Sequence, residues 1–238
     1  MLFAILFFFL CTVGVLILSN KIENIFPEYQ NVIAAILAIS LGFSFFKAIE
    51  IILKKLAVTT DKLKISNLRK GFSLGFIVLF FSVSVLYLSG YTLSLEKFGW
   101  EKIFDQILFQ LRPAILEEIG FRFGIVSIAS HFFGNRVALI LGSIPFGVVH
   151  LLNFTSGEAI YWEYIIGTTV AGIFLTSVYF SYGLLGAIGA HYSWNVFASI
   201  SSQASTFKQE NLEAGLWTYC ILISCSLLLF RLRVSKKN

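Results

Sequence analysis

The stretch FSLGFIVLFFSVSVLYLSGYTL, residues 72–93, contains no charged side chain. An apolar run of about 18 residues or more is typical of a helix that crosses a membrane. The whole chain has the same character, because 57% of its 238 residues are hydrophobic and only 13% are charged. That charged share is about half of the share in a soluble domain, which excludes a soluble globular protein. We therefore predict an all-α, polytopic membrane protein.

Similar apolar segments recur along the chain. The predicted spans are Leu2–Leu18, Val32–Leu53, Phe72–Leu93, about Ala114–Phe133, Val137–Leu152, Tyr164–Phe180, Gly183 to about Ser201, and Leu216–Phe230. Before the fourth span, Ile103–Leu111 reads as an amphipathic lead-in at the membrane interface, and Pro113 starts or kinks the next helix. No repeat or long linker divides the chain, so we expect residues 1–238 to form a single membrane-embedded domain of about eight transmembrane helices.

The charges in the loops predict a topology. The net charge of +5 comes mainly from a basic loop at 54–70 and a basic tail at 231–238, and eight spans place both on one side. Each link on the other side carries more acid than base, which agrees with the positive-inside rule. No nucleic-acid-binding signature accompanies the basic residues. We predict that both termini are cytoplasmic, and the small loops without targeting signals favour a bacterial plasma membrane.

Three groups of polar residues lie inside the predicted spans. They are Glu117, Glu118 and Arg122 in the fourth span, His150 in the fifth, and His191 and Asn195 in the seventh. A charge at the centre of a membrane helix costs about 2.5–3.5 kcal/mol, so these charges require an explanation. An i,i+4 ion pair between Glu118 and Arg122 accounts for two of them and leaves Glu117 unexplained.

The residue types in these groups fit hydrolysis. A hydrolytic centre needs a base for water, a group that holds the oxyanion and residues that orient both, and glutamate, histidine and asparagine supply these roles without a serine or cysteine nucleophile. A transporter that uses the charges as a proton relay is a competing interpretation, but the chain shows neither inverted repeats nor paired broken helices.

Three motifs carry a resemblance to a known family. The patterns Glu-Glu-x-x-x-Arg at 117–122, Phe-x-x-x-His at 146–150 and His-x-x-x-Asn at 191–195 resemble the motifs of the CAAX-protease and bacteriocin-processing (CPBP, or Abi) family. That family includes the type II CAAX prenyl endopeptidases. The resemblance covers about residues 112–200 and implies a membrane-embedded endopeptidase with its catalytic core in that region.

The resemblance also implies a role for each residue. Glu117 would activate water, and His150 would position that water or bind a metal. His191 and Asn195 would polarise the peptide carbonyl and stabilise the oxyanion. The pair Glu118–Arg122 would support the helix and tune Glu117.

The metal and the substrate stay open at this point. Glu117, His150 and His191 would form a zinc site with one open position, yet a metal-free glutamate mechanism fits the same residues. Suitable substrates are prenylated CAAX proteins and precursors of bacteriocins or pheromones. The alternative function is a non-proteolytic membrane partner, such as an immunity or regulatory protein with the same fold.

Two glycine patterns predict helix packing. Residues 71–75, Gly-Phe-Ser-Leu-Gly, match the nucleophile motif of serine hydrolases, but that motif needs a strand-to-helix turn and here opens a membrane span. We interpret its small residues as helix contacts. Gly183, Gly186 and Gly189 likewise predict a close helix contact near His191.

Overall fold

The computed structural model describes residues 10, 13, 14 and 17 singly and the segments 30–58, 63–88, 92–93, 99–153, 162–206 and 221–229. Within these segments the chain is helical apart from one pair of two-residue strands, which confirms the all-α class. The first predicted span lies outside the described residues except for the four single positions. Of the eighth span, residues 221–229 are described, and they are helical.

The described elements follow the chain in a simple order. The helices are α2 (Gln30–Lys55), α3 (Ile65–Leu88), α4 (Trp100–Phe109), α5 (Leu111–Glu117), the π-helix η3 (Glu118–Val126), α6 (Ser127–Phe133), α7 (Asn135–Val149), the 3-10 helix η4 (His150–Asn153) and α8 (Trp162–Ala204). The strands β1 (Thr92–Leu93) and β2 (Ser205–Thr206) pair antiparallel, so the chain that follows α3 lies beside the end of α8.

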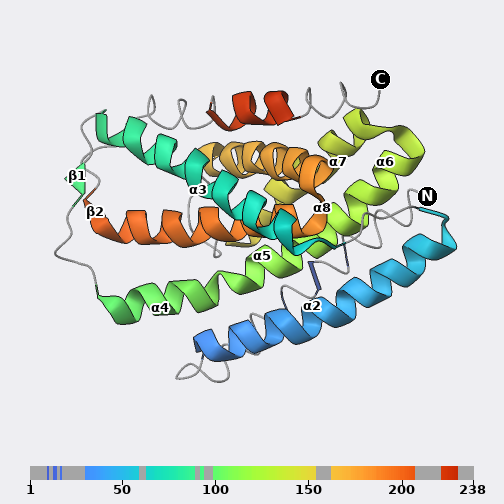
Figure 1. Ribbon diagram of the computed structural model, residues 1–238, viewed down its shortest axis with the longest axis horizontal. Coiled ribbons are helices and arrows are strands. Elements are labelled where there is room, and N and C mark those ends of the chain that lie inside the picture. The colour runs from blue at the N-terminus through green and yellow to red at the C-terminus, as the bar shows by residue number, and fades with distance from the viewer. Residues whose placement is uncertain are drawn as a thin grey trace.

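Three described helical segments are long and apolar enough to cross a membrane. They are Ile65–Val85, Asn135–Leu152 and Tyr164–Ile200. Together with the apolar composition they make the chain an integral membrane protein with helical spans. The count of eight spans stays a prediction. Figure 1 shows the end of α2 and the α6–α7 turn on the side away from β1 and β2, as the predicted alternation of loops requires.

The helix α8 is broken at Gly183. This residue has φ 69° and ψ −169°, a conformation that only glycine adopts readily. An unbroken helix would place Gly172 and His191 about 28 Å apart. Both instead contact the Glu118–Arg122 pair, whose charged atoms lie 3.1 Å apart. The two halves of α8 therefore fold back beside each other, as the predicted spans Tyr164–Phe180 and Gly183–Ser201 require.

Glycines make the contact between α3 and α8. A β-carbon on Gly71 would collide with the carbonyl of Gly186, and one on Gly189 would lie 2.8 Å from the backbone nitrogen of Phe72. The backbones of the two helices thus touch where side chains are missing. Ser73, the serine of the apparent hydrolase motif, is exposed. This confirms that the glycines of this motif serve packing.

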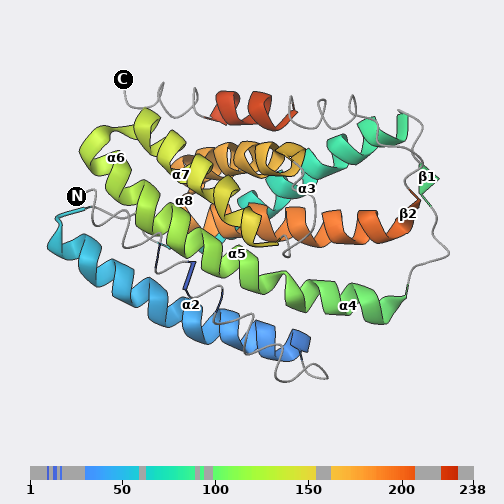
Figure 2. The same cartoon turned by 180° about the vertical axis from the view of Figure 1, so that it is seen from behind.

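The segment from α4 to α6 runs between α2 and α8 (Figures 1 and 2). Every residue from Leu116 to Ala129 is buried there, so the charged motif lies in the interior of the protein. As predicted, a separate helix precedes the fourth span: α4 ends at Phe109, Gln110 separates the two helices, and α5 begins at Leu111, close to the expected start near Ala114. Pro113 is accommodated in the first turn of α5, where its missing N–H is least needed.

Candidate active site

The charged motif lies where an α-helix becomes a π-helix. The helix α5 ends at Glu117, and the nine residues Glu118–Val126 wind as a π-helix, all of them buried. At the end of this segment the N–H of Ser127 bonds to the carbonyl of Arg122, five residues earlier. Such turns are rare and occur most often at functional sites. The sequence carries no signal for this change of helix type.

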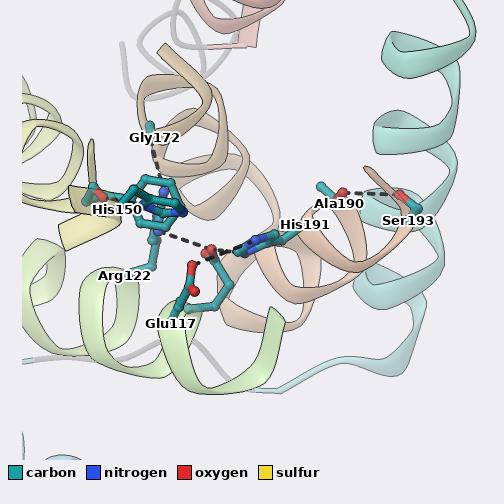
Figure 3. Close-up of polar contacts among 9 residues, drawn as sticks. Glu117, Arg122, His150, Gly172, Ala190, His191 and Ser193 are labelled. Atoms are coloured by element: carbon teal, nitrogen blue, oxygen red, sulfur yellow. Dashed lines mark hydrogen bonds and ion pairs between the residues drawn. The ribbon is translucent and has the colours of Figure 1, made fainter. Parts of the chain in front are cut away.

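Glu118 binds two partners through one oxygen. Its Oε1 lies 3.1 Å from Nη1 of Arg122 and 2.8 Å from Nδ1 of His191 (Figure 3). The side chains of Glu118 and Arg122 are fully buried. The predicted ion pair is thus present. The second bond shows that Glu118 also orients the histidine of another helix, which the sequence did not predict.

Arg122 is held from the side opposite Glu118. Its Nη2 donates a hydrogen bond of 3.3 Å to the carbonyl of Gly172, in the first half of α8. The guanidinium also lies 4.2 Å from the ring centroid of Phe146, a cation–π distance. The sequence does not predict these two partners of Arg122, because neither a glycine carbonyl nor an apolar ring is marked by a charged residue.

Glu117 stands next to His191 without pairing tightly. Its buried Oε2 has no hydrogen-bond partner among the described residues and lies 3.9 Å from Nε2 of His191. An ionised Glu118 only accepts hydrogen bonds, so Nδ1 of His191 carries the proton of their bond. Nε2 therefore faces Glu117, and a separation of this size allows one water to contact both groups.

His150 borders this cluster without entering it. Its Nδ1 donates a hydrogen bond of 2.7 Å to the carbonyl of Phe146, one turn earlier in α7. The ring of Phe146 lies 4.8 Å from that of His150 and 5.9 Å from that of His191, measured between centroids. Phe146 therefore contacts both histidines, and no described polar contact joins His150 to Glu117.

Asn195 lies one turn beyond His191 on α8. It is half-buried, and the described residues offer its side chain no hydrogen-bond partner. Of the six predicted site residues, the structure thus joins Glu117, Glu118, Arg122 and His191 directly. It places His150 and Asn195 at the edge of this cluster.

The predicted zinc ligands do not converge. No group of three or more His, Cys, Asp or Glu side chains in the described segments is arranged to hold a metal ion. His191 and His150 each use Nδ1 for a protein acceptor, so these two bonds leave Nε2 of both rings and do not themselves argue against a metal; the distance between the candidate ligands does. The arrangement of Glu117, His150 and His191 does not fit the three-ligand site, and no step is derived through a metal.

Further contacts attach the charged segment to α8. Gln110 donates to Ser199 at 2.9 Å, and the hydroxyl of Tyr192 donates to the carbonyl of Ile107 at 3.0 Å. Beyond the π-helix, Ser127 and Tyr179 share a hydrogen bond of 2.6 Å. Sequence reasoning missed these residues because single polar side chains in apolar spans are common and carry no motif.

Comparison with known proteins gives one match. The family model described as type II CAAX prenyl endopeptidase, Rce1-like, matches residues 99–197, a segment that contains all six predicted site residues. Searches of curated proteins and of solved structures gave no match to the chain. The family match confirms the resemblance inferred from the three motifs, and the chain is similar to CAAX-type membrane proteases over this segment.

Proposed function

We propose that this protein is a membrane-embedded endopeptidase in which Glu117 activates water to attack a peptide bond. The similarity of residues 99–197 to a protease family supports the reaction class. The observation that carries the mechanism is the buried, unpartnered oxygen of Glu117 that lies 3.9 Å from Nε2 of His191. A base next to a protein-held water is what peptide hydrolysis without a nucleophilic side chain requires.

Charge balance assigns the base. Arg122 forms its ion pair with Glu118 and acts on Glu117 only at longer range, whereas the described ion-pair partner of Glu117 is His191, at 3.9 Å. Glu117 is thus the carboxylate able to take a proton from water. General bases of this kind contribute about 10²–10⁴-fold to the rate.

His191 and Asn195 form the other half of the reaction. In its imidazolium form, His191 donates from Nδ1 to Glu118 and has a second N–H, on Nε2, for the carbonyl oxygen of the substrate. Asn195, one turn away, supplies an amide N–H from the same face of α8. Donors aimed at a developing oxyanion are worth about 10²–10³-fold each in a site that excludes water.

The substrate is a membrane-associated protein or peptide. A prenylated CAAX protein follows from the description of the matching family, and a bacteriocin or pheromone precursor is the other class we consider. We further propose eight spans with both termini in the cytoplasm of a bacterial plasma membrane. The separation of basic and acidic loops in the sequence supports this topology.

The test is cleavage of a defined peptide by the protein reconstituted in lipid vesicles. The probe is a farnesylated peptide that ends in a CAAX motif, and mass spectrometry identifies the products. We expect Glu117→Gln, which keeps the size of the side chain, to lower the cleavage rate at least about 100-fold.

The control is Asp105→Asn, which neutralises an exposed carboxylate on α4 and should leave the rate unchanged. Full cleavage by Glu117→Gln would refute the proposed mechanism. A parallel series with a chelator, followed by added zinc, shows whether a metal takes part. If cells that carry Glu117→Gln in place of the wild-type protein show no defect, whereas cells without the protein do, the non-proteolytic function is favoured instead.

A further inference from the structure

Among the side-chain contacts that join α8 to the α4–α5–η3 run, two lie at matching intervals. Gln110 meets Ser199, and Glu118 meets His191. On each helix the two contacting residues are eight positions apart. The residue that comes first on one helix contacts the residue that comes last on the other, so the two helices are antiparallel here. The contacts therefore fix the register of one helix against the other at two points.

Asn195 occupies the midpoint between these two contacts. On α8 it lies four residues from His191 and four from Ser199, or about 6 Å along the axis from each. The residue at the matching position of the other helix is the fully buried Ala114, which has no polar side chain. Asn195 thus lies on the face of α8 that carries His191 and Ser199, between the two contacts.

The contact at Gln110 lies where the backbone hydrogen bonds of this run are interrupted. Gln110 separates α4 from α5, and Pro113 removes the N–H that would bond to the carbonyl of Phe109. The side chain of Gln110 is almost completely buried and donates both to Ser199, at 2.9 Å, and to Gln106, at 3.2 Å. The side chain of Gln110 thus connects the end of α4 to α8 at the point where α4 gives way to α5.

We propose that Gln110 is a positioning residue for the reaction, acting through Ser199 to align Asn195 and His191 with Glu117. The inference rests on the proposed peptidase function. It assigns to Gln110 no contact with the substrate. Its loss leaves the Glu118–His191 contact and the bond of Tyr192 to Ile107 in place but allows the turn of α8 around Ser199 to shift, which misplaces the oxyanion donor on the preceding turn. Misplacement of about 1 Å lowers rates by as much as about 100-fold.

The experiment uses Gln110→Met, which keeps the length of the side chain and removes its amide. Ser199 remains able to bond to a carbonyl of its own helix, so the variant should fold. With the farnesylated CAAX peptide in lipid vesicles, we expect kcat to fall about tenfold or more while KM changes less than about twofold. The thermal midpoint should stay within a few degrees of wild type.

A swap provides the rescue. Gln110→Ser combined with Ser199→Gln restores a hydrogen bond across the same two positions and should recover at least half of the lost kcat, whereas each single substitution should not. Gln106→Met tests which of the two contacts of Gln110 matters, because it removes the bond between Gln106 and Gln110 and leaves the bond to Ser199. It should retain nearly full activity.

The outcomes separate this inference from the proposed function. If the wild type shows no cleavage that depends on Glu117, the proposed function fails and the inference falls with it. If the wild type cleaves but Gln110→Met is equally active, only the inference fails. A parallel loss of kcat and of thermal stability, without rescue by the swap, would show a merely structural role and would also overturn it.

Discussion

Two ion pairs with the same spacing have different surroundings. On α2, Glu50 and Lys54 pair at 3.2 Å, with side chains that are 22% and 71% exposed. In η3, Glu118 and Arg122 pair at 3.1 Å, and both side chains are fully buried. In the exposed pair, Glu50 has one further partner, Lys47. The buried pair has three further partners: a backbone carbonyl and an aromatic ring that contact Arg122, and a histidine that contacts Glu118. Spacing creates the contact, but burial decides what the contact does.

The energetic reason is desolvation. A charge removed from water must be compensated by every available partner, so a buried pair organises the groups around it. An exposed pair is compensated by solvent and contributes little. Glu118 therefore determines the orientation of His191, whereas Glu50 has no comparable effect on the fold.

The largest effect expected from this comparison is that of Arg122→Met. It leaves the carboxylate of Glu118 buried without its cation, and such changes cost about 3–5 kcal/mol. We expect a corresponding fall of the thermal midpoint in detergent micelles. A loss below about 1 kcal/mol would mean that Glu118 is compensated by His191 alone.

A smaller loss is expected for Gly183→Ala. The backbone at Gly183 lies in a region that is open almost only to glycine, and strain of this kind costs about 1–3 kcal/mol. Because the turn brings Gly172 and His191 to the ion pair, peptide cleavage should fall with stability. Ser181→Ala, on the adjacent turn, removes one hydrogen bond to Ser177 and serves as the control. Equal stability of the two variants would contradict this prediction.

The double variant Arg122→Met with Glu118→Gln separates the effect of the buried charges on stability from the effect of Glu118 on cleavage. Because this variant removes the charge of Glu118 together with its cation, its free energy of unfolding should lie closer to that of wild type than the value for Arg122→Met does. Cleavage should stay low, because His191 loses the carboxylate that orients it. Recovery of both properties would show that Glu118 has no role in the reaction.

The smallest effect is expected at the exposed pair. Glu50→Gln should change the free energy of unfolding by about 0.5 kcal/mol or less, and salt should reduce the difference further. The same thermal assay measures it, and cleavage of the farnesylated peptide should be unchanged. A cost comparable with that of Arg122→Met would remove the distinction between the two pairs.

Local features of the site were predictable from the sequence. The i,i+4 pair Glu118–Arg122, the surplus of Glu117 and the glycine contact of α8 with a neighbouring helix follow from spacing within one segment. The helical class follows from composition. The separate helix before the fourth span also follows from the sequence, because Ile103–Leu111 is only moderately apolar and Pro113 comes soon after it.

Contacts between helices were beyond such reasoning. Nothing in the spacing of Glu118 shows that it bonds to His191, seventy-three residues later. The π-helix has no sequence pattern of its own, and the contact of Phe146 with both histidines depends on how α7 meets α8. These features arise from tertiary packing, which also decides that the three predicted zinc ligands form no metal-binding group among the described residues.

The glycine contact between α3 and α8 predicts which mutations outside the charged cluster abolish cleavage. A β-carbon on Gly75 would collide with Ser193 and with the carbonyl of Ala190, the residues on either side of the turn that begins with His191. α3 contributes no group to the cluster, yet it limits how far this turn of α8 can rotate. Random mutagenesis that selects for lost cleavage should therefore recover Gly75 as readily as the charged residues, and suppressor mutations should appear on α8 opposite it.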